Sequence, residues 1–345
     1  MHNLVLYRKY RPSVWEEVVG QDHIVDALSL SVEKESFSHA YLFTGSRGTG
    51  KTSVARIFAR ALGTSADDII EIDAASNRGV EAIDELRSNV RTLPFSSRFK
   101  VYIIDEVHML SNHAFNALLK TLEEPPAHVI FILATTEFDK VPDTIISRCQ
   151  LFSFRKPSPK ILAERVLRVA EQEGLSIDKE SADLIAFLGD GSFRDTYGVL
   201  QKVASSVKDR VINTERIEAA TGAPSLTLTT SLFQALFAND IDLAYKTLQD
   251  AETHHTDMKL LAELLLKTIR VMLMYRYAPS QRATIEGEYG EKYVALIQDG
   301  AAASTTISSR SILSLITAIE RISYASVATI PLELAMLEMM GIEGK

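Results

Sequence analysis

The chain has 345 residues, of which 46% are hydrophobic and 24% charged, and its formal net charge at pH 7 is −8. This composition is ordinary for a soluble globular protein of two or three domains. The acidity disfavours nucleic acid as a partner unless basic residues gather locally. A single cysteine excludes an intrachain disulfide and a cysteine-based zinc site. Because the sequence has neither a signal-peptide pattern nor a membrane-length apolar run, we expect a cytoplasmic protein without a membrane partner.

The first 155 residues contain apolar runs that alternate with helical patterns. The runs lie at 39–45, 68–73, 100–107, 128–136 and 150–154, and the helical patterns at 51–62, 80–92 and 112–122. The runs are continuously apolar, as expected for strands that are buried on both faces. The pattern predicts an α/β domain with a parallel sheet flanked by helices.

A proline-containing linker at 154–160 ends this domain, and the strand pattern stops there. Helical patterns follow at 159–173, 179–188, 192–206 and 214–220, and after "TGAPS" (221–225) at 241–250, 257–277, 291–298 and 309–340. We predict three domains: an α/β nucleotide-binding domain at 1–157, a small helical lid at 158–221 and an all-helical domain at 222–345.

A glycine-rich segment, "TGSRGTGKTS" at 44–53, follows the first predicted strand and opens a helix. It matches G-x-x-x-x-G-K-[ST], a loop that directs backbone N–H groups at phosphates. Lys51 is expected to reach the β- and γ-phosphates of a nucleotide, and Thr52 to bind Mg²⁺. The loop residues expected at the nucleotide are Gly45, Ser46, Arg47, Gly48, Thr49, Gly50, Lys51, Thr52 and Ser53. The alternative is a glycine-rich turn without a ligand.

Polar residues also follow the third and fourth predicted strands. "VYIIDEVH" (101–108) ends in Asp105, expected to hold Mg²⁺, and Glu106, expected to activate the attacking water as a general base. Thr136, or alternatively Thr135, is expected to hydrogen-bond the γ-phosphate or that water. An acidic turn and strand-forming threonines are the structural alternatives. His108 is expected to pack beside the sheet, with metal binding as its alternative.

Together these motifs resemble the AAA+ ATPases of DNA clamp loaders, and among them the gamma/tau subunits of bacterial DNA polymerase III. The resemblance rests on Gly45–Thr52, Asp105–Glu106, Thr136, "SRC" (147–149), "GSFRD" (191–195), "NALLKTLEEPP" (116–126), "EIDAASNRGVE" (71–81) and "YRKYRPSVWEEVVGQ" (7–21). It implies an AAA+ module, a helical lid and an all-α collar that joins subunits. It also implies an ATPase motor that opens and loads the sliding clamp on primed DNA, within a DNA-polymerizing holoenzyme.

The resemblance assigns roles to further residues. Val18 and Val19 would pack near the adenine base. Arg194 would reach the γ-phosphate of its own subunit, and its alternative is a salt bridge to Asp195 or to another neighbouring residue. Arg148 would project into the nucleotide site of the adjacent subunit, and its alternative is an ordinary surface arginine. Cys149 is expected to be a small buried residue, because no histidine–carboxylate set accompanies it.

The resemblance also implies partners: other clamp-loader subunits in a hetero-oligomer, expected to be a pentamer, together with the sliding clamp and primed DNA. Arg78 and Lys120 are the expected contacts to DNA phosphates, with solvated surface charge as the alternative. The segment 108–115 is a candidate clamp contact, although core packing explains its apolar residues equally well. Most relatives carry a four-cysteine zinc module that 60–73 lacks, so we expect ATP and Mg²⁺ but no zinc.

Two other functions fit the same scaffold. The first is another AAA+ motor, a helicase or a protein unfoldase, but the loop "TLPFSSRF" (92–99) has no glycine and so lacks an unfoldase pore motif. The second is an ATP-binding scaffold subunit that does not hydrolyse ATP. The presence of both Lys51 and Glu106 favours hydrolysis.

Overall fold

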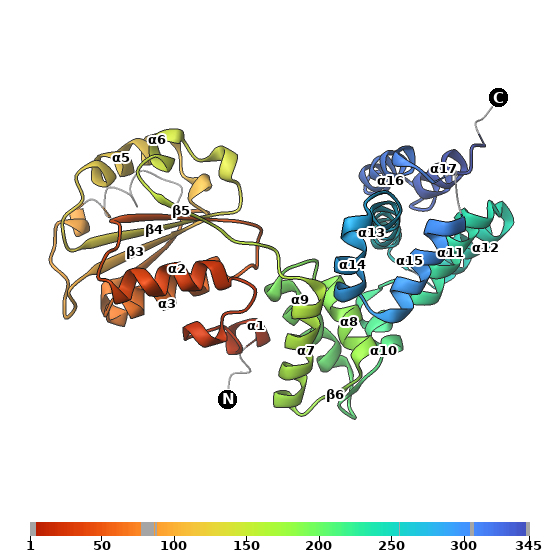
Figure 1. The fold of residues 1–345 in the computed structure, drawn as a ribbon, viewed down its shortest axis with the longest axis horizontal. Coiled ribbons are helices and arrows are strands. Elements are labelled where there is room, and N and C mark those ends of the chain that lie inside the picture. Colours follow the sequence, from red (N-terminus) through yellow and green to blue (C-terminus); the bar gives the residue numbers. More distant parts are fainter. Residues whose placement is uncertain (1–4, 77–85, 87, 255, 304–306, 343–345) are drawn as a thin grey trace. The chain divides into compact units, whose positions relative to one another are not determined.

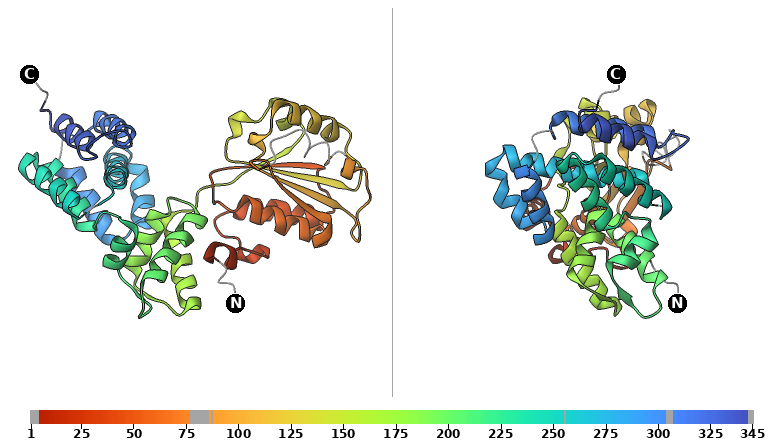
Figure 2. Two further views of the ribbon diagram at one scale, coloured as in Figure 1. Left: turned by 180° about the vertical axis from the view of Figure 1, so that it is seen from behind. Right: turned by 90° about the vertical axis from the view of Figure 1, so that its right-hand side faces the viewer.

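The computed structural model of the chain describes residues 5–76, 86, 88–254, 256–303 and 307–342, without the side chains of Leu226 and Lys292. Two compact units are distinguished, and each is described by itself. Unit 1 comprises 1–162 with 189–198, and unit 2 comprises 163–188 with 199–345. The elements are labelled in Figure 1, and Figure 2 gives two further views.

Unit 1 is built on a five-stranded parallel sheet. Its strands are β1 (Ala40–Thr44), β2 (Ile69–Asp73), β3 (Lys100–Asp105), β4 (Val129–Thr135) and β5 (Gln150–Ser153), in the spatial order β2-β3-β4-β1-β5. Leu42 of β1 pairs with Leu133 of β4 on one side and with Leu151 of β5 on the other. The predicted parallel sheet is therefore confirmed. A ligand site is expected at the carboxyl ends of such strands.

Helices cover both faces of this sheet, as Figures 1 and 2 show. On one face lie α2 (Asp22–Glu33) and α3 (Lys51–Ala61), and on the other lie α5 (Asn112–Glu123) and α6 (Asp143–Ile146). Short elements complete the unit: α1 (Leu6–Lys9), η1 (Trp15–Glu17), η2 (Ala66–Asp68), η3 (Val107–Met109) and η4 (Phe138–Lys140). Of the helix predicted at 80–92, residues 80–85 and 87 lie outside the described part, and 86 and 88–90 are helical.

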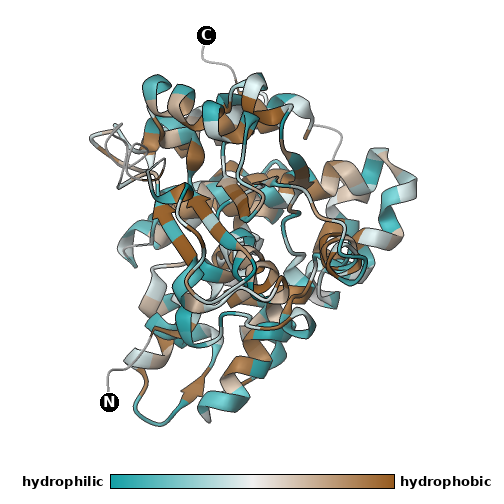
Figure 3. Ribbon diagram, turned by 90° about the vertical axis from the view of Figure 1, so that its left-hand side faces the viewer, coloured by the Kyte–Doolittle hydropathy of each residue, from teal (hydrophilic) through white to brown (hydrophobic). Residues whose placement is uncertain are grey.

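The strands supply two hydrophobic cores because successive side chains point to opposite faces. Tyr41 and Phe43 of β1 pack with Phe58 of α3 in one core. Leu42 packs with Leu118 of α5 in the other. The strands are accordingly coloured largely brown, for hydrophobic, in Figure 3.

Helices dominate the rest of the chain. They are α7 (Pro159–Glu173), α8 (Lys179–Leu188), α9 (Phe193–Ser206), α10 (Thr214–Thr221), α11 (Leu226–Ala238), α12 (Ile241–Thr253), α13 (Met258–Tyr277), η5 (Pro279–Gln281), α14 (Arg282–Glu288), α15 (Glu291–Ala303), α16 (Ser309–Ile322) and α17 (Ile330–Met339). The C-terminal ones share a core that includes Phe233, Leu265 and Met272. None of the helices within the described ranges is both long and apolar enough to cross a membrane.

One expectation about this half was wrong. The strand pattern does not end at 160, because β6 (Ser176–Ile177) pairs in parallel with β7 (Val211–Ile212). Strands of two residues are too short to produce a recognisable period. The helical pattern predicted at 309–340 is divided between two helices, α16 and α17. Pro331 lies in the first turn of α17, where the missing N–H is tolerated, whereas it would break a continuous helix.

Candidate nucleotide-binding site

The glycine-rich loop follows β1 and closes tightly on the residues around it. Gly45 has φ +143°, and a Cβ there would come within 2.6 Å of the Phe154 carbonyl oxygen. Gly48 has φ +75°, and a Cβ there would come within 1.9 Å of Ser192 Oγ. Both positions therefore require glycine for conformation and for space. The loop ends at Gly50, directly before the first residue of α3.

Lys51 begins α3 and is turned back into the loop. Its side chain is buried, and Nζ donates hydrogen bonds of 2.7 Å to the Gly45 carbonyl and 2.9 Å to the Ser46 carbonyl. Burial lowers the pKa of Lys51, although the carboxylates of Glu106 and Asp105 partly offset this effect. A buried ammonium held by neutral carbonyls is well prepared for an anionic ligand.

Thr52 links the loop to β3. Its Oγ1 donates a 2.7 Å hydrogen bond to Asp105 Oδ2, across 53 positions of sequence. A hydroxyl and a carboxylate oxygen thus lie side by side at the carboxyl ends of the strands. Such oxygen donors suit Mg²⁺, so the donor set fits the predicted ion.

Glu106 directly follows β3 and adopts a left-handed backbone conformation, with φ +49°. Its amide donates to Asp105 Oδ1 at 3.0 Å, and its Oε2 accepts a 2.9 Å hydrogen bond from Thr136 Oγ1. This conformation is uncommon for a residue with a side chain and is held here by surrounding contacts. Of the two threonines considered, Thr136 is the one that contacts Glu106.

His108 is buried beside these residues. Its Nδ1 lies 3.0 Å from Thr135 Oγ1 and 3.5 Å from Glu106 Oε2. Its Nε2 lies 3.1 Å from Glu137 Oε1, and Glu137 also pairs with Lys140 at 2.7 Å. The histidine therefore packs beside the sheet, as expected, but it also connects Glu106 to Glu137. The sequence analysis did not predict this connection.

The segment 189–198 packs directly on the glycine-rich loop. The Phe193 amide donates a 3.0 Å hydrogen bond to the Gly48 carbonyl. The Arg194 guanidinium lies 5.7 Å from the centre of the Tyr7 ring, within range of a cation–π contact. Arg194 also lowers the pKa of Lys51. Its effect is smaller than that of burial, which lowers this pKa too, and smaller than those of the two carboxylates, which raise it. The structure thus brings Arg194 to the loop, together with Tyr7 and Ser192, which were not predicted.

Val18 and Val19 follow η1 and are half-buried, and Val18 packs against the core beside α3. The next polar side chain, Gln21, is buried and makes two hydrogen bonds with the Arg155 backbone, of 2.7 and 3.1 Å. These bonds fix the segment 18–21 to the strand-end linker. The adenine contact of Val18 and Val19 stays a prediction.

Arg148 lies just after α6 and is paired within its own chain. Its guanidinium donates 2.7 Å hydrogen bonds to the Thr144 carbonyl and to Glu123 Oε1. Cys149 beside it packs against a core cluster, and burial raises the pKa of its thiol to about 12. A thiol that stays protonated is a poor nucleophile.

The residues predicted to contact DNA and the clamp differ in their surroundings, and one of them is not described by the structure. Arg78 lies outside the described residues, and Lys120 is exposed on α5. In the candidate clamp segment 108–115, Leu110 and Phe115 are buried in a core cluster. Core packing therefore explains these apolar residues, and they leave little surface for a partner.

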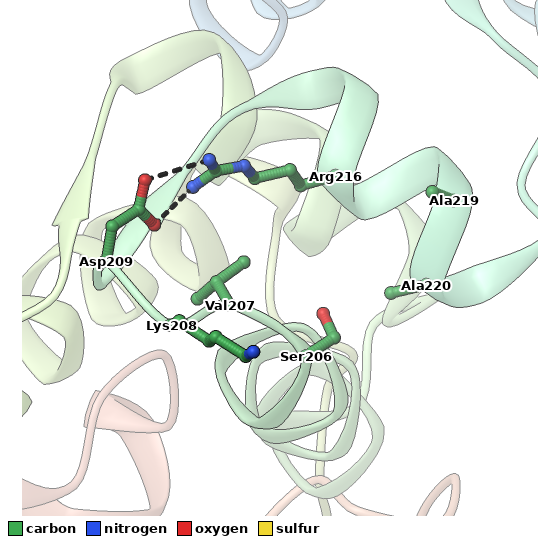
Figure 4. A pocket seen from close by; sticks show the side chains of 7 residues that line it. All are labelled: Ser206, Val207, Lys208, Asp209, Arg216, Ala219 and Ala220. Carbon is green, nitrogen blue, oxygen red and sulfur yellow. Dashed lines mark hydrogen bonds and ion pairs between the residues drawn. The ribbon is translucent and has the colours of Figure 1, made fainter.

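An open pocket of about 460 Å³ lies in unit 2, between the end of α9 and α10. It is lined by Ser206, Val207, Lys208, Asp209, Arg216, Ala219 and Ala220. Figure 4 shows Asp209 and Arg216 joined by two hydrogen bonds, of 2.6 and 2.9 Å. Arg216 lowers the pKa of Asp209 to about 2. The two charges satisfy each other, and the pocket contains none of the predicted nucleotide residues.

Curated relatives resemble most of the chain. A DNA polymerase III subunit tau of Bacillus subtilis is 42% identical over 302 residues, which are 81% of this chain and 54% of that protein. A gamma/tau subunit of Mycobacterium bovis is 37% identical over 299 residues, which are 80% of this chain and 52% of that protein. Over most of its length the chain is similar to the gamma/tau subunits of DNA polymerase III. It spans about half the length of these relatives.

The chain has two further similarities. The family model of the DNA polymerase III delta subunit matches residues 63–158. Among solved structures, the RuvB Holliday junction branch migration motor of Thermotoga maritima superposes with a TM-score of 0.54 at 22% identity, over 66% of this chain and 79% of that one. At that identity the likeness concerns the fold alone, and it supports the AAA+-like architecture of the α/β core.

Proposed function

We propose that the chain is the ATP-hydrolysing motor subunit of a DNA clamp loader, which loads the sliding clamp on primed DNA. The observation that carries the proposal is the 2.7 Å hydrogen bond from Thr52 to Asp105, which joins the phosphate loop to the acidic strand end. Relatives named as DNA polymerase III gamma/tau subunits support the assignment to a replication complex.

ATP would lie in the loop from Gly45 to Ser53, with the adenine near Val18 and Val19. Lys51 would exchange its two carbonyl partners for phosphate oxygens, which suits a buried cation. Thr52 and Asp105 would hold Mg²⁺, which supplies charge neutralisation on the β- and γ-phosphates when bound.

Glu106 would orient the attacking water and take its proton, because its carboxylate stands directly after Asp105 at the strand end. Thr136 would hold the Glu106 side chain through their 2.9 Å hydrogen bond. Arg194 would reach the γ-phosphate of the same subunit from the segment packed on the loop. Arg148 would act in the site of a neighbouring subunit, where an arginine stabilises charge on the transferred phosphoryl group.

The C-terminal helices would provide the surface that joins subunits. Leu313 and Ile316 are three residues apart on α16, and Ile330 and Leu334 are four apart on α17, so each pair shares a helix face. All four are exposed, and Leu313 and Leu334 are 63% and 55% accessible. Exposed apolar faces of this kind suit another subunit of the loader. In this proposal the lid spans residues 158–221 and the collar spans residues 222–345.

A loop at the other end of the sheet would contact the clamp. Leu93 and Phe95 are 77% and 86% exposed and lie before β3, at the amino ends of the strands. The loop is pinned by Asp68, whose carboxylate accepts hydrogen bonds from the amides of Phe95, Ser96 and Ser97. A fixed apolar pair is a suitable anchor for a protein partner. Lys120 and Arg78 would contact DNA phosphates.

The proposal is tested by titrating the purified chain with a fluorescent ATP analogue and Mg²⁺. Wild type should bind. Lys51→Ala should bind at least about tenfold more weakly, because charge-assisted hydrogen bonds are lost. Lys34→Ala, at an exposed lysine after α2, should match wild type. Equal binding by all three proteins would contradict the assigned site.

A further inference from the structure

We infer that Glu123 is a positioning residue for Arg148: it holds the arginine inside its own chain until a neighbouring subunit's nucleotide displaces it. The inference rests on the proposed function of Arg148. Its basis is an ion pair that the sequence motifs did not indicate, with Arg148 Nη2 2.7 Å from Glu123 Oε1.

The pair results from the end of α5. Glu123 is the last residue of that helix, and Glu124 follows it. The C-terminus of a helix carries partial negative charge, so two carboxylates there are unfavourable without a cation. Lys120 in the last turn supplies one positive charge, and Arg148, placed by the end of α6, supplies a second that pairs directly with Glu123. A contact that relieves local repulsion explains why the arginine is directed to Glu123.

The geometry makes Glu123 a competitor and not a permanent anchor. Three hydrogen bonds, to Thr144, Ser147 and Glu123, use three of the five N–H donors of Arg148. A phosphate bound by the planar fork of Arg148 would need the Nη2 group that Glu123 Oε1 now contacts. The 2.7 Å hydrogen bond from Arg148 to the Thr144 carbonyl does not involve Glu123, so it keeps the Arg148 side chain oriented when the ion pair breaks.

The ion pair between Arg148 and Glu123 is also weak enough to be broken. The side chains of Arg148 and Glu123 are 34% and 50% exposed. A partly exposed ion pair changes an equilibrium by up to about fivefold, which the multiple charges of a triphosphate can overcome. Glu123 therefore lowers the ATPase rate of the unstimulated loader, but it does not block ATP hydrolysis when clamp and primed DNA are present.

The test is steady-state ATPase of the loader assembled with its partner subunits, with and without clamp and primed DNA. Glu123→Gln should raise the unstimulated rate up to about fivefold and change the stimulated rate little, with unaltered ATP affinity. The matched control Glu124→Gln removes the same charge from the adjacent exposed residue and should behave as wild type.

The same substitution in an Arg148→Ala loader decides whether Glu123 acts through the arginine. In that background Glu123→Gln should have no effect. An effect that persists there, or an unstimulated rate that falls or stays constant in Glu123→Gln alone, would overturn the inference while leaving the proposed function intact. If Arg148→Ala itself turned over like wild type, the role of Arg148 in a neighbouring site would fail, and this inference with it.

Discussion

Thr52 Oγ1 and Asp105 Oδ2 lie 2.7 Å apart, although one lies in the first turn of the helix after β1 and the other ends β3. The order of the sheet makes this possible, since β4 alone separates β1 from β3 and all three strands end at the same edge. A hydroxyl and a carboxylate are thereby placed beside the buried ammonium of Lys51.

Replacing Thr52 by alanine should uncouple Mg²⁺ from nucleotide binding. The variant loses one oxygen donor and leaves Asp105 without its hydrogen-bond partner. We expect the Mg²⁺ concentration needed for half-maximal ATPase to rise about tenfold, the effect of one charge-assisted hydrogen bond. Thr52→Ser, which keeps the hydroxyl, should behave as wild type. Equal Mg²⁺ requirements in all three proteins would show that Thr52 is not a ligand.

Glu106→Gln should bind ATP as wild type does but hydrolyse it about 10²–10⁴-fold more slowly, because the amide cannot accept the proton of the attacking water. Single-turnover hydrolysis and nucleotide binding, measured on the same preparation, separate the two effects. Loss of binding would instead assign Glu106 a structural role, maintaining the strained turn at φ +49°.

Several of these placements could be predicted because their signals are local. The motif around Lys51 and the acidic pair at 105–106 each lie within a few residues of a strand end, and parallel strands bring their carboxyl ends together. The contact of Ser192 with Gly48 and the ion pair of Glu123 with Arg148 span long stretches of sequence, and no short-range period encodes them. The sequence shows such residues, but only the fold shows their partners.

The contact of Asp68 with the loop before β3 is another that the sequence does not show. This contact makes the stability of the fold depend on pH. Burial would raise the pKa of Asp68, but hydrogen bonds from Ser96, Phe95, Ser97 and Ser65 outweigh it and lower the pKa to about 2. A carboxyl whose pKa falls on folding stabilises the fold above its ordinary pKa. That contribution is lost as the pH drops from about 4 towards 2.

Asp68→Asn should therefore destabilise unit 1 by about 1–3 kcal/mol at neutral pH, because charge-assisted hydrogen bonds to three backbone amides are lost. The difference from wild type in the midpoint of thermal unfolding should shrink as the pH is lowered from 6 to 3. Asp67→Asn, at the exposed neighbouring position, provides the control. A difference that did not change with pH would refute the role of the charged carboxylate.

Leu334→Glu should weaken assembly with other loader subunits at least about tenfold, because it places a charge on the exposed apolar face of α17. Analytical ultracentrifugation of the mixed subunits measures this. Leu93→Glu, which adds the same charge to an exposed leucine of the other unit, should assemble normally and lose clamp binding instead. If Leu334→Glu assembled like wild type, this face of α17 would not be the subunit contact.

The most direct test of the clamp-loader assignment is steady-state ATPase of the assembled loader, measured alone, with clamp, and with clamp plus primed DNA. We expect clamp and primed DNA together to stimulate the wild-type rate, and the response to disappear when the chain carries Lys51→Ala. A rate that does not respond to clamp and DNA, or a response that persists in the Lys51→Ala loader, would contradict the assignment.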